Sequence, residues 1–117
     1  MKTHRDLDAW KLGIELANTI YELTRGFPRE ELYGLSSQMR RAAVSVPTNI
    51  AEGAARESVK DFRRFLFIAR GSLAELETLL LIASKSKLIS EAEENNLLAS
   101  RNRVAKTLQG LIRSLNT

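Results

Sequence analysis

Side chains that form hydrogen bonds follow one row of a predicted helix near the middle of the chain. The members of the row are three or four residues apart: Gln38, Arg41, Ser45, Thr48 and Glu52. This spacing places them on one helical face. A neighbouring apolar row continues through Asn49 and Gly53, where larger apolar side chains would pack more stably. Such a row could form a hydrogen-bonded network, bind a small ligand or provide a hydrolytic centre.

The next predicted helix supplies partners for this row. In an antiparallel hairpin of the two helices, Ser72 lies level with Arg41. Glu75 lies level with Gln38, and we expect it to be partly buried. We expect it to pair with Arg40 or Arg41, because an unpaired buried carboxylate is costly or takes up a proton. The predicted polar network has eight members: Gln38, Arg40, Arg41, Ser45, Asn49, Glu52, Ser72 and Glu75.

We interpret this network as structural, fixing the helix register or a subunit interface. Paired buried charges often specify an arrangement without doing chemistry. A ligand or catalytic site is the alternative interpretation.

Positive charge is concentrated in the same part of the chain. Residues 36–71 contain seven basic and three acidic side chains, an excess equal to the net charge of +4. The predicted nucleic-acid-binding residues are Arg56, Lys60, Arg63, Arg64 and Arg70. They could neutralise backbone phosphates of RNA or DNA, or form a solvated face with local ion pairs. Few aromatic residues could stack on bases, so we expect salt-sensitive binding led by shape.

The composition excludes several other functions. The 117 residues contain no cysteine and only one histidine, His4, which we expect at the surface of a frayed segment. The Glu-x-x-His pairs of di-iron bundles and a glycine-rich phosphate loop are both missing. We therefore expect a non-enzymatic protein without metal or cofactor. Without a long apolar run or an apolar leader, we expect no membrane association and a cytoplasmic location.

Apolar periodicity predicts an all-α domain spanning residues 1–117. The expected helices cover about 6–25, a stretch within 29–55, 58 to about 84, and 90 to the end. The second helix starts either at Pro28 or after a short turn before Ser36, and Pro47 should kink it. Short connections predict an antiparallel up-down-up-down four-helix bundle. Isolated glycines predict close packing at four points: Gly13, Gly53, Gly71 and Gly110.

The third predicted helix is apolar on more sides than a small bundle can cover. Its third apolar row repeats at intervals of seven residues: Phe67, Ala74 and Leu81. A helix with this pattern requires burial on more than one side. We therefore expect these residues to form an interface between copies of the chain.

Several motifs resemble the four-helix bundle family named after proteins encoded in intervening sequences of bacterial 23S rRNA genes. The matching segments are Trp10, Phe27-Pro28, Tyr33-Gly34-Leu35, residues 38–45, residues 49–53 and residues 69–75. The resemblance implies a homopentamer of antiparallel bundles without enzymatic activity. It also implies a fold related to the accessory protein of diversity-generating retroelements, which partners a reverse transcriptase and nucleic acid.

Two hypotheses about function follow. The first is a non-enzymatic, oligomeric protein that binds nucleic acid, RNA above all, through the arginine-rich face. The second is a homo-oligomeric scaffold or adaptor whose basic surface meets an acidic protein partner. RNA binding that ignores salt, or that survives charge reversal at Arg63 and Arg64, would count against the first hypothesis. Failure to retain RNA or DNA at low salt would favour the second.

Overall fold

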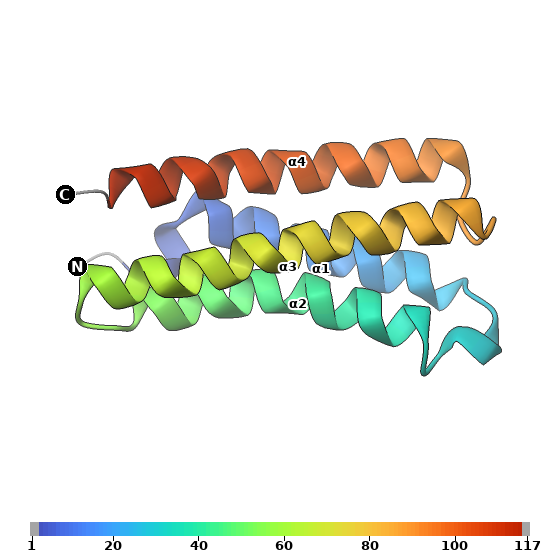
Figure 1. Ribbon diagram of the computed structural model, residues 1–117, viewed down its shortest axis with the longest axis horizontal. Helices are drawn as coiled ribbons and strands as arrows, with labels where there is room; N and C mark the ends of the chain where they lie inside the picture. The colour runs from blue at the N-terminus through green and yellow to red at the C-terminus, as the bar shows by residue number, and fades with distance from the viewer. Residues whose placement is uncertain (1–2, 116–117) are drawn as a thin grey trace.

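Four α-helices make up most of the computed structural model, which describes residues 3–115. They are α1 (Asp8–Arg25), α2 (Leu35–Ala54), α3 (Val59–Lys85) and α4 (Glu91–Ser114), with short 3₁₀ turns η1 (His4–Asp6) and η2 (Arg29–Glu31). The chain reverses direction at each connection (Figure 1). Each helix contacts two neighbours, so that α1 and α3 lie diagonally opposite each other. The predicted all-α four-helix bundle is confirmed.

Local capping explains where the helices begin. The hydroxyl oxygen of Ser58 accepts a hydrogen bond of 3.0 Å from the Asp61 amide at the start of α3. At the start of α4, Ser90 and Glu93 cap each other's backbone amides in a complete capping box. Such caps satisfy amides that have no partner inside the helix. Both starts agree with the sequence-based prediction.

A short 3₁₀ turn, which the periodicity did not settle, precedes each of the first two helices. Thr3 caps the turn η1, and Leu7 is extended, so α1 starts two residues later than expected. The turn η2 and Gly34 precede α2, which selects the short-turn alternative for its start. His4 belongs to η1, where its ring stands edge-on to Trp10 at 5.1 Å, and it is partly buried. The expectation of a frayed, surface-exposed histidine was therefore wrong.

The apolar faces of the helices meet in one core along the length of the bundle. Its large, fully buried side chains include Leu16, Ile20, Met39, Leu66, Leu73, Leu80 and Leu108. Leu66, Leu73 and Leu80 recur every seven residues along α3, so this helix contributes to the core over most of its length. Burying one side chain of this size stabilises the folded state by roughly 1.5–3 kcal/mol.

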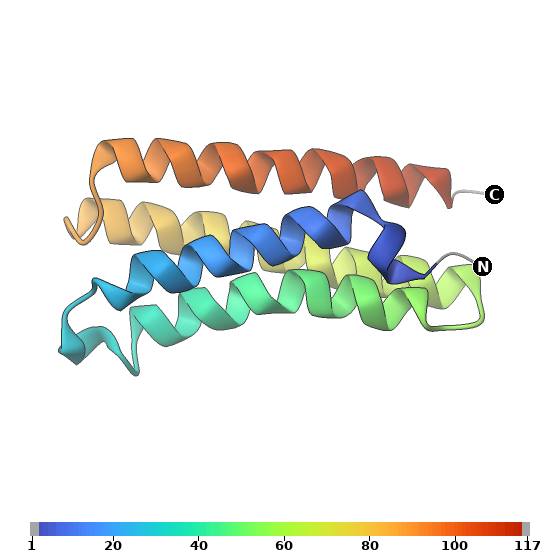
Figure 2. The same cartoon turned by 180° about the vertical axis from the view of Figure 1, so that it is seen from behind.

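Two of the four glycines are points of close helix approach. A Cβ atom built on Gly13 would lie 3.4 Å from the ring of Pro47, which is buried within α2. One built on Gly53 would lie 2.8 Å from the Cβ atom of Phe65 in α3. Figure 2 shows α1 and α2 side by side from behind. The helix continues through Pro47, and the kink expected there stays a prediction.

The other two glycines do not mark close contacts. Gly71 and Gly110 are exposed, and nothing lies within 4 Å of a Cβ atom built on either. The expectation of close packing was wrong for these two positions. Both lie on outward sides of their helices, which the spacing of single glycines does not reveal.

Candidate functional site

A small hydrogen-bonded network lies between α2 and α3. The Ser72 hydroxyl donates to the Ser45 hydroxyl oxygen at 2.9 Å, and Ser72 is buried. The Asn49 amide nitrogen donates to the Ser45 hydroxyl and carbonyl oxygens at 2.9 and 2.8 Å. The structure therefore brings together three of the eight residues in the predicted polar network.

Glu75 does not join this network, contrary to expectation. Its side chain is exposed, and within residues 3–115 it has no ion pair with Arg40 or Arg41. The physical reason is its place on α3, where exposed Gly71 and Thr78 share its outward side. Water hydrates the carboxylate there, so no partner is required.

Arg40 turns toward α1 instead of α3. Its Nε atom donates to the Thr24 hydroxyl at 2.8 Å, and its guanidinium lies 4.7 Å from the centre of the Tyr21 ring. Thr24 is buried and donates in turn to the Ile20 carbonyl oxygen at 2.8 Å. Arg40 is thus a tie between α1 and α2, with both a hydrogen bond and a cation–π contact.

The remaining members of the predicted network lie at the surface. Glu52 forms an exposed ion pair of 3.5 Å with Arg56, one turn further along the chain. A polar groove of about 850 Å³ runs along α2, and five predicted network residues line it: Gln38, Arg41, Ser45, Asn49 and Glu75. They line an open groove and do not fill an enclosed space between the helices. The expectation of one enclosed network was therefore only partly right.

Four of the five predicted nucleic-acid-binding residues lie in two pairs, each pair at one phenyl ring. The guanidiniums of Arg56 and Arg64 lie 4.9 and 4.5 Å from the centre of the Phe65 ring. Those of Arg63 and Arg70 lie 5.3 and 4.7 Å from the centre of the Phe67 ring. Arg56 and Arg64 also have carboxylate partners at 3.5 Å, which are Glu52 and Asp61. The fifth predicted residue, Lys60, is exposed.

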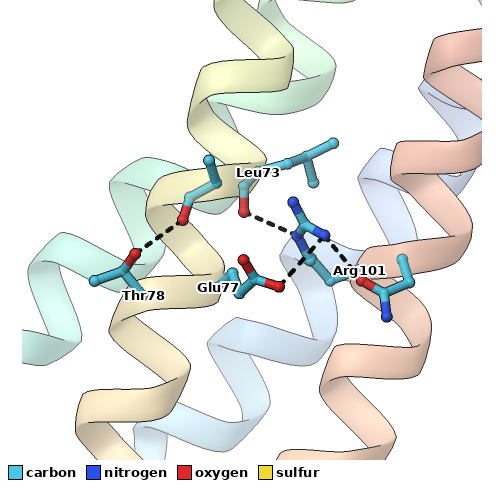
Figure 3. A network of polar contacts seen from close by, with 6 residues as sticks. Leu73, Glu77, Thr78 and Arg101 are labelled. Atoms are coloured by element: carbon cyan, nitrogen blue, oxygen red, sulfur yellow. Dashed lines mark hydrogen bonds and ion pairs between the residues drawn. The ribbon is translucent and has the colours of Figure 1, made fainter.

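Long side chains connect α3 to α4. Arg63 donates to the Ile112 carbonyl oxygen at 2.8 Å, and Arg70 donates to the Gln109 side chain at 3.3 Å. Figure 3 shows Arg101 reaching from α4 to α3. Its Nε atom donates to the Leu73 carbonyl oxygen at 3.0 Å.

Arg101 was not among the residues predicted from the sequence, although a signal for it existed. It lies 3.8 Å from Glu77, and only 15% of its side chain is exposed. It is the single cation in an otherwise apolar row of α4: Leu97, Arg101, Val104 and Leu108. A cation in such a row indicates a long side chain that reaches past the core to a polar partner.

The predicted oligomer-interface row is exposed in the single chain. Phe67 and Leu81 are 39% and 43% exposed, and Ala74 between them is also exposed. Ile68 and Ile82 on the same helix are 43% and 46% exposed. Each of these four large side chains therefore leaves more than one-third of its surface uncovered in the single chain.

Residues 3–115 lack two further features. They contain no group of three or more His, Cys, Asp or Glu side chains placed to hold a metal ion. Among their helices, none combines the length and the apolar character required to cross a membrane.

Comparison with known proteins adds a family and a fold. A family model described as 23S rRNA-intervening sequence protein matches residues 5–110. A crystal structure from Bacteroides thetaiotaomicron VPI-5482, described as a protein with unknown function from the S23 ribosomal protein family, superposes with a TM-score of 0.84. The two chains are 24% identical over 90% of this chain and 95% of the other, a likeness that concerns the fold alone. No curated protein matches the chain.

Proposed function

The chain belongs to the 23S rRNA-intervening sequence protein family, and from this premise we propose a non-enzymatic, oligomeric protein that associates with nucleic acid, RNA above all. The cytoplasmic location expected from the sequence is part of the same proposal. The contact surface is the basic surface of α3 and of the turn that precedes it, with Arg56, Lys60, Arg63, Arg64 and Arg70. Phosphate backbones are the ligands that such a surface fits, since each arginine stays charged and offers several donors.

The arrangement of arginines around Phe65 and Phe67 is the observation that carries this proposal. Each ring holds two guanidiniums within 5.3 Å of its centre. Long side chains held in this way lose less conformational entropy when they bind a ligand. The rings act as supports for the cations rather than as platforms for bases.

Retention of a structured RNA across a salt series tests the proposal. Reversing two exposed charges, Lys60→Glu with Arg64→Glu, should weaken binding at least about tenfold at low salt. Reversing two exposed charges of the same types on α1, Lys11→Glu with Arg25→Glu, is the matched control and should weaken it much less. Binding that ignores salt, or that survives the α3 reversal unchanged, would contradict the proposal.

We assign the assembly to the exposed row of α3. Large apolar side chains on this helix, among them Leu81 and Ile82, remain more than one-third exposed in the single chain. Another copy could cover them, and the family resemblance puts the number of copies at five. Light scattering should give a mass several times that of one chain, and Leu81→Asp should lower it. A wild-type mass equal to one chain would contradict this part.

A second candidate function is a scaffold or adaptor for an acidic protein partner, and Tyr33 favours it. Tyr33 is 93% exposed and lines the polar groove beside Arg41. Tyrosine and arginine are enriched at protein interfaces and at their energetic hot spots. If no RNA or DNA is retained at low salt and Tyr33→Ala abolishes capture of an acidic protein, this function replaces the first.

A further inference from the structure

We propose that α4 supplies half of the phosphate-binding surface, and that its ligand is duplex rather than single-stranded nucleic acid. The surface is a basic band of four side chains: Arg63 and Arg70 of α3, with Lys106 and Arg113 of α4. This inference rests on the proposed function and assigns new residues and a ligand class to it.

Positive charge without nearby acidic residues occurs on both helices. Residues 62–74 and 95–115 contain seven basic side chains and no Asp or Glu. The two segments lie side by side, because Arg63 and Arg70 bond to Ile112 and Gln109. The fold therefore places two stretches without acidic residues, far apart in the sequence, side by side (Figure 1).

The two α4 cations lie on the side of their helix that borders α3. Gln109 faces α3, since it accepts a hydrogen bond from Arg70. Lys106 precedes Gln109 by three residues and Arg113 follows it by four, so all three share one side of the helix. Lys106 and Arg113 are both exposed. They extend the arginine pair of α3 across the contact between the helices.

These four cations are available to a ligand. Within residues 3–115, none of the four has a carboxylate within 4.0 Å, whereas Arg56 and Arg64 do. Arg63 and Arg70 each donate one N–H to α4, and a guanidinium carries five. Positive charge without a carboxylate partner therefore lies at the contact between α3 and α4 and not along α3 alone.

The ligand class follows from the geometry and from what the surface lacks. Seven residues separate the two cations on each helix, a rise of about 10 Å, and packed helices lie about 8–10 Å apart. An array of this size can meet several phosphates of a duplex strand. Two guanidiniums lie within 5.3 Å of the centre of the Phe67 ring, so less of this ring is available for stacking on an unpaired base.

The test is the salt dependence of binding to a duplex RNA, a duplex DNA and a single strand of equal length. The band alone should contribute about −3.6 to the slope of log K against log salt, a loss of about 150-fold between 50 and 200 mM. Replacing the α4 pair, Lys106→Gln with Arg113→Gln, should reduce the slope by about 2 and this loss by about tenfold. Both duplexes should bind at least about tenfold more tightly than the single strand.

The matched control is Lys11→Gln with Arg25→Gln. It removes one lysine charge and one arginine charge from exposed positions on α1 and should leave the slope unchanged. Lys106→Gln alone, expected to reduce the slope by about 1, provides an independent second variant. An unchanged slope in both α4 variants, with RNA still bound, overturns this inference and leaves the proposed function standing. A single strand bound as tightly as the duplexes overturns the ligand class. Failure of wild-type protein to bind any probe overturns the proposed function.

Discussion

The α2–α3 contact and the α3–α4 contact join the same helix to its neighbours in different ways. At the first, Gly53 lets the backbone of α2 approach Phe65, and short side chains such as Ser45 and Ser72 bond directly. At the second, long side chains such as Arg101 reach across to backbone and side-chain oxygens. Close contacts tolerate few substitutions, whereas long side chains tie two helices and still present charge to solvent.

Gly53→Ala should give the largest effect in this comparison. The new Cβ atom would lie 2.8 Å from Phe65 Cβ and 3.2 Å from the Phe62 carbonyl oxygen, so a backbone must move. We expect a loss of roughly 1–3 kcal/mol in the free energy of unfolding, after a helix-propensity gain of about 1 kcal/mol. Chemical denaturation measures it. An unchanged midpoint would show that α2 and α3 are farther apart than described.

Arg101→Met should come next, because it removes the main polar tie between α3 and α4 while keeping most of the buried volume. We expect a loss of about 1–2 kcal/mol from the hydrogen bond to Leu73 and the contact with Glu77. Arg103→Met, at an exposed position on the same helix, is the control and should stay within about 0.5 kcal/mol. Equal effects of the two would remove the role assigned to Arg101.

Ser72→Ala should have a smaller effect, about 1 kcal/mol, because it removes the single hydroxyl donor that reaches Ser45. A double-mutant cycle with Ser45→Ala isolates the contact, since each variant alone also alters other bonds. A coupling energy indistinguishable from zero would mean that the serine pair does not hold α2 against α3.

Gly110→Ala should change stability least and in the opposite direction. Nothing lies within 4 Å of a Cβ atom built there, so the alanine keeps its helix propensity without a clash. We expect a gain of about 0.5–1 kcal/mol. The same substitution should thus lower the stability at Gly53 and raise it at Gly110. A loss of stability at Gly110 would contradict the exposure of this part of α4.

The sequence was sufficient for the elements of the fold and less so for the contacts between them. Ser58, Ser90 and the apolar periodicity located α3 and α4, because caps and helical spacing are local properties. Glu75 and Arg40 were misplaced because both lie at the edges of their buried faces. One residue turns a helix by about 100°, so a fraction of that rotation decides which neighbour such a side chain meets.

The arginines at Phe67 bear on which part of α3 could bind a polyanion and which part could bind a second copy of the chain. Cations flank the one aromatic side chain on its outward surface, while the aliphatic side chains Leu81 and Ile82 lie near the other end without such cover. A second copy would therefore bury the most exposed apolar surface by packing against the aliphatic half. The cationic half would stay open to a polyanion, and the two roles would meet at Phe67, which belongs to the predicted interface row and lies beside Arg63 and Arg70.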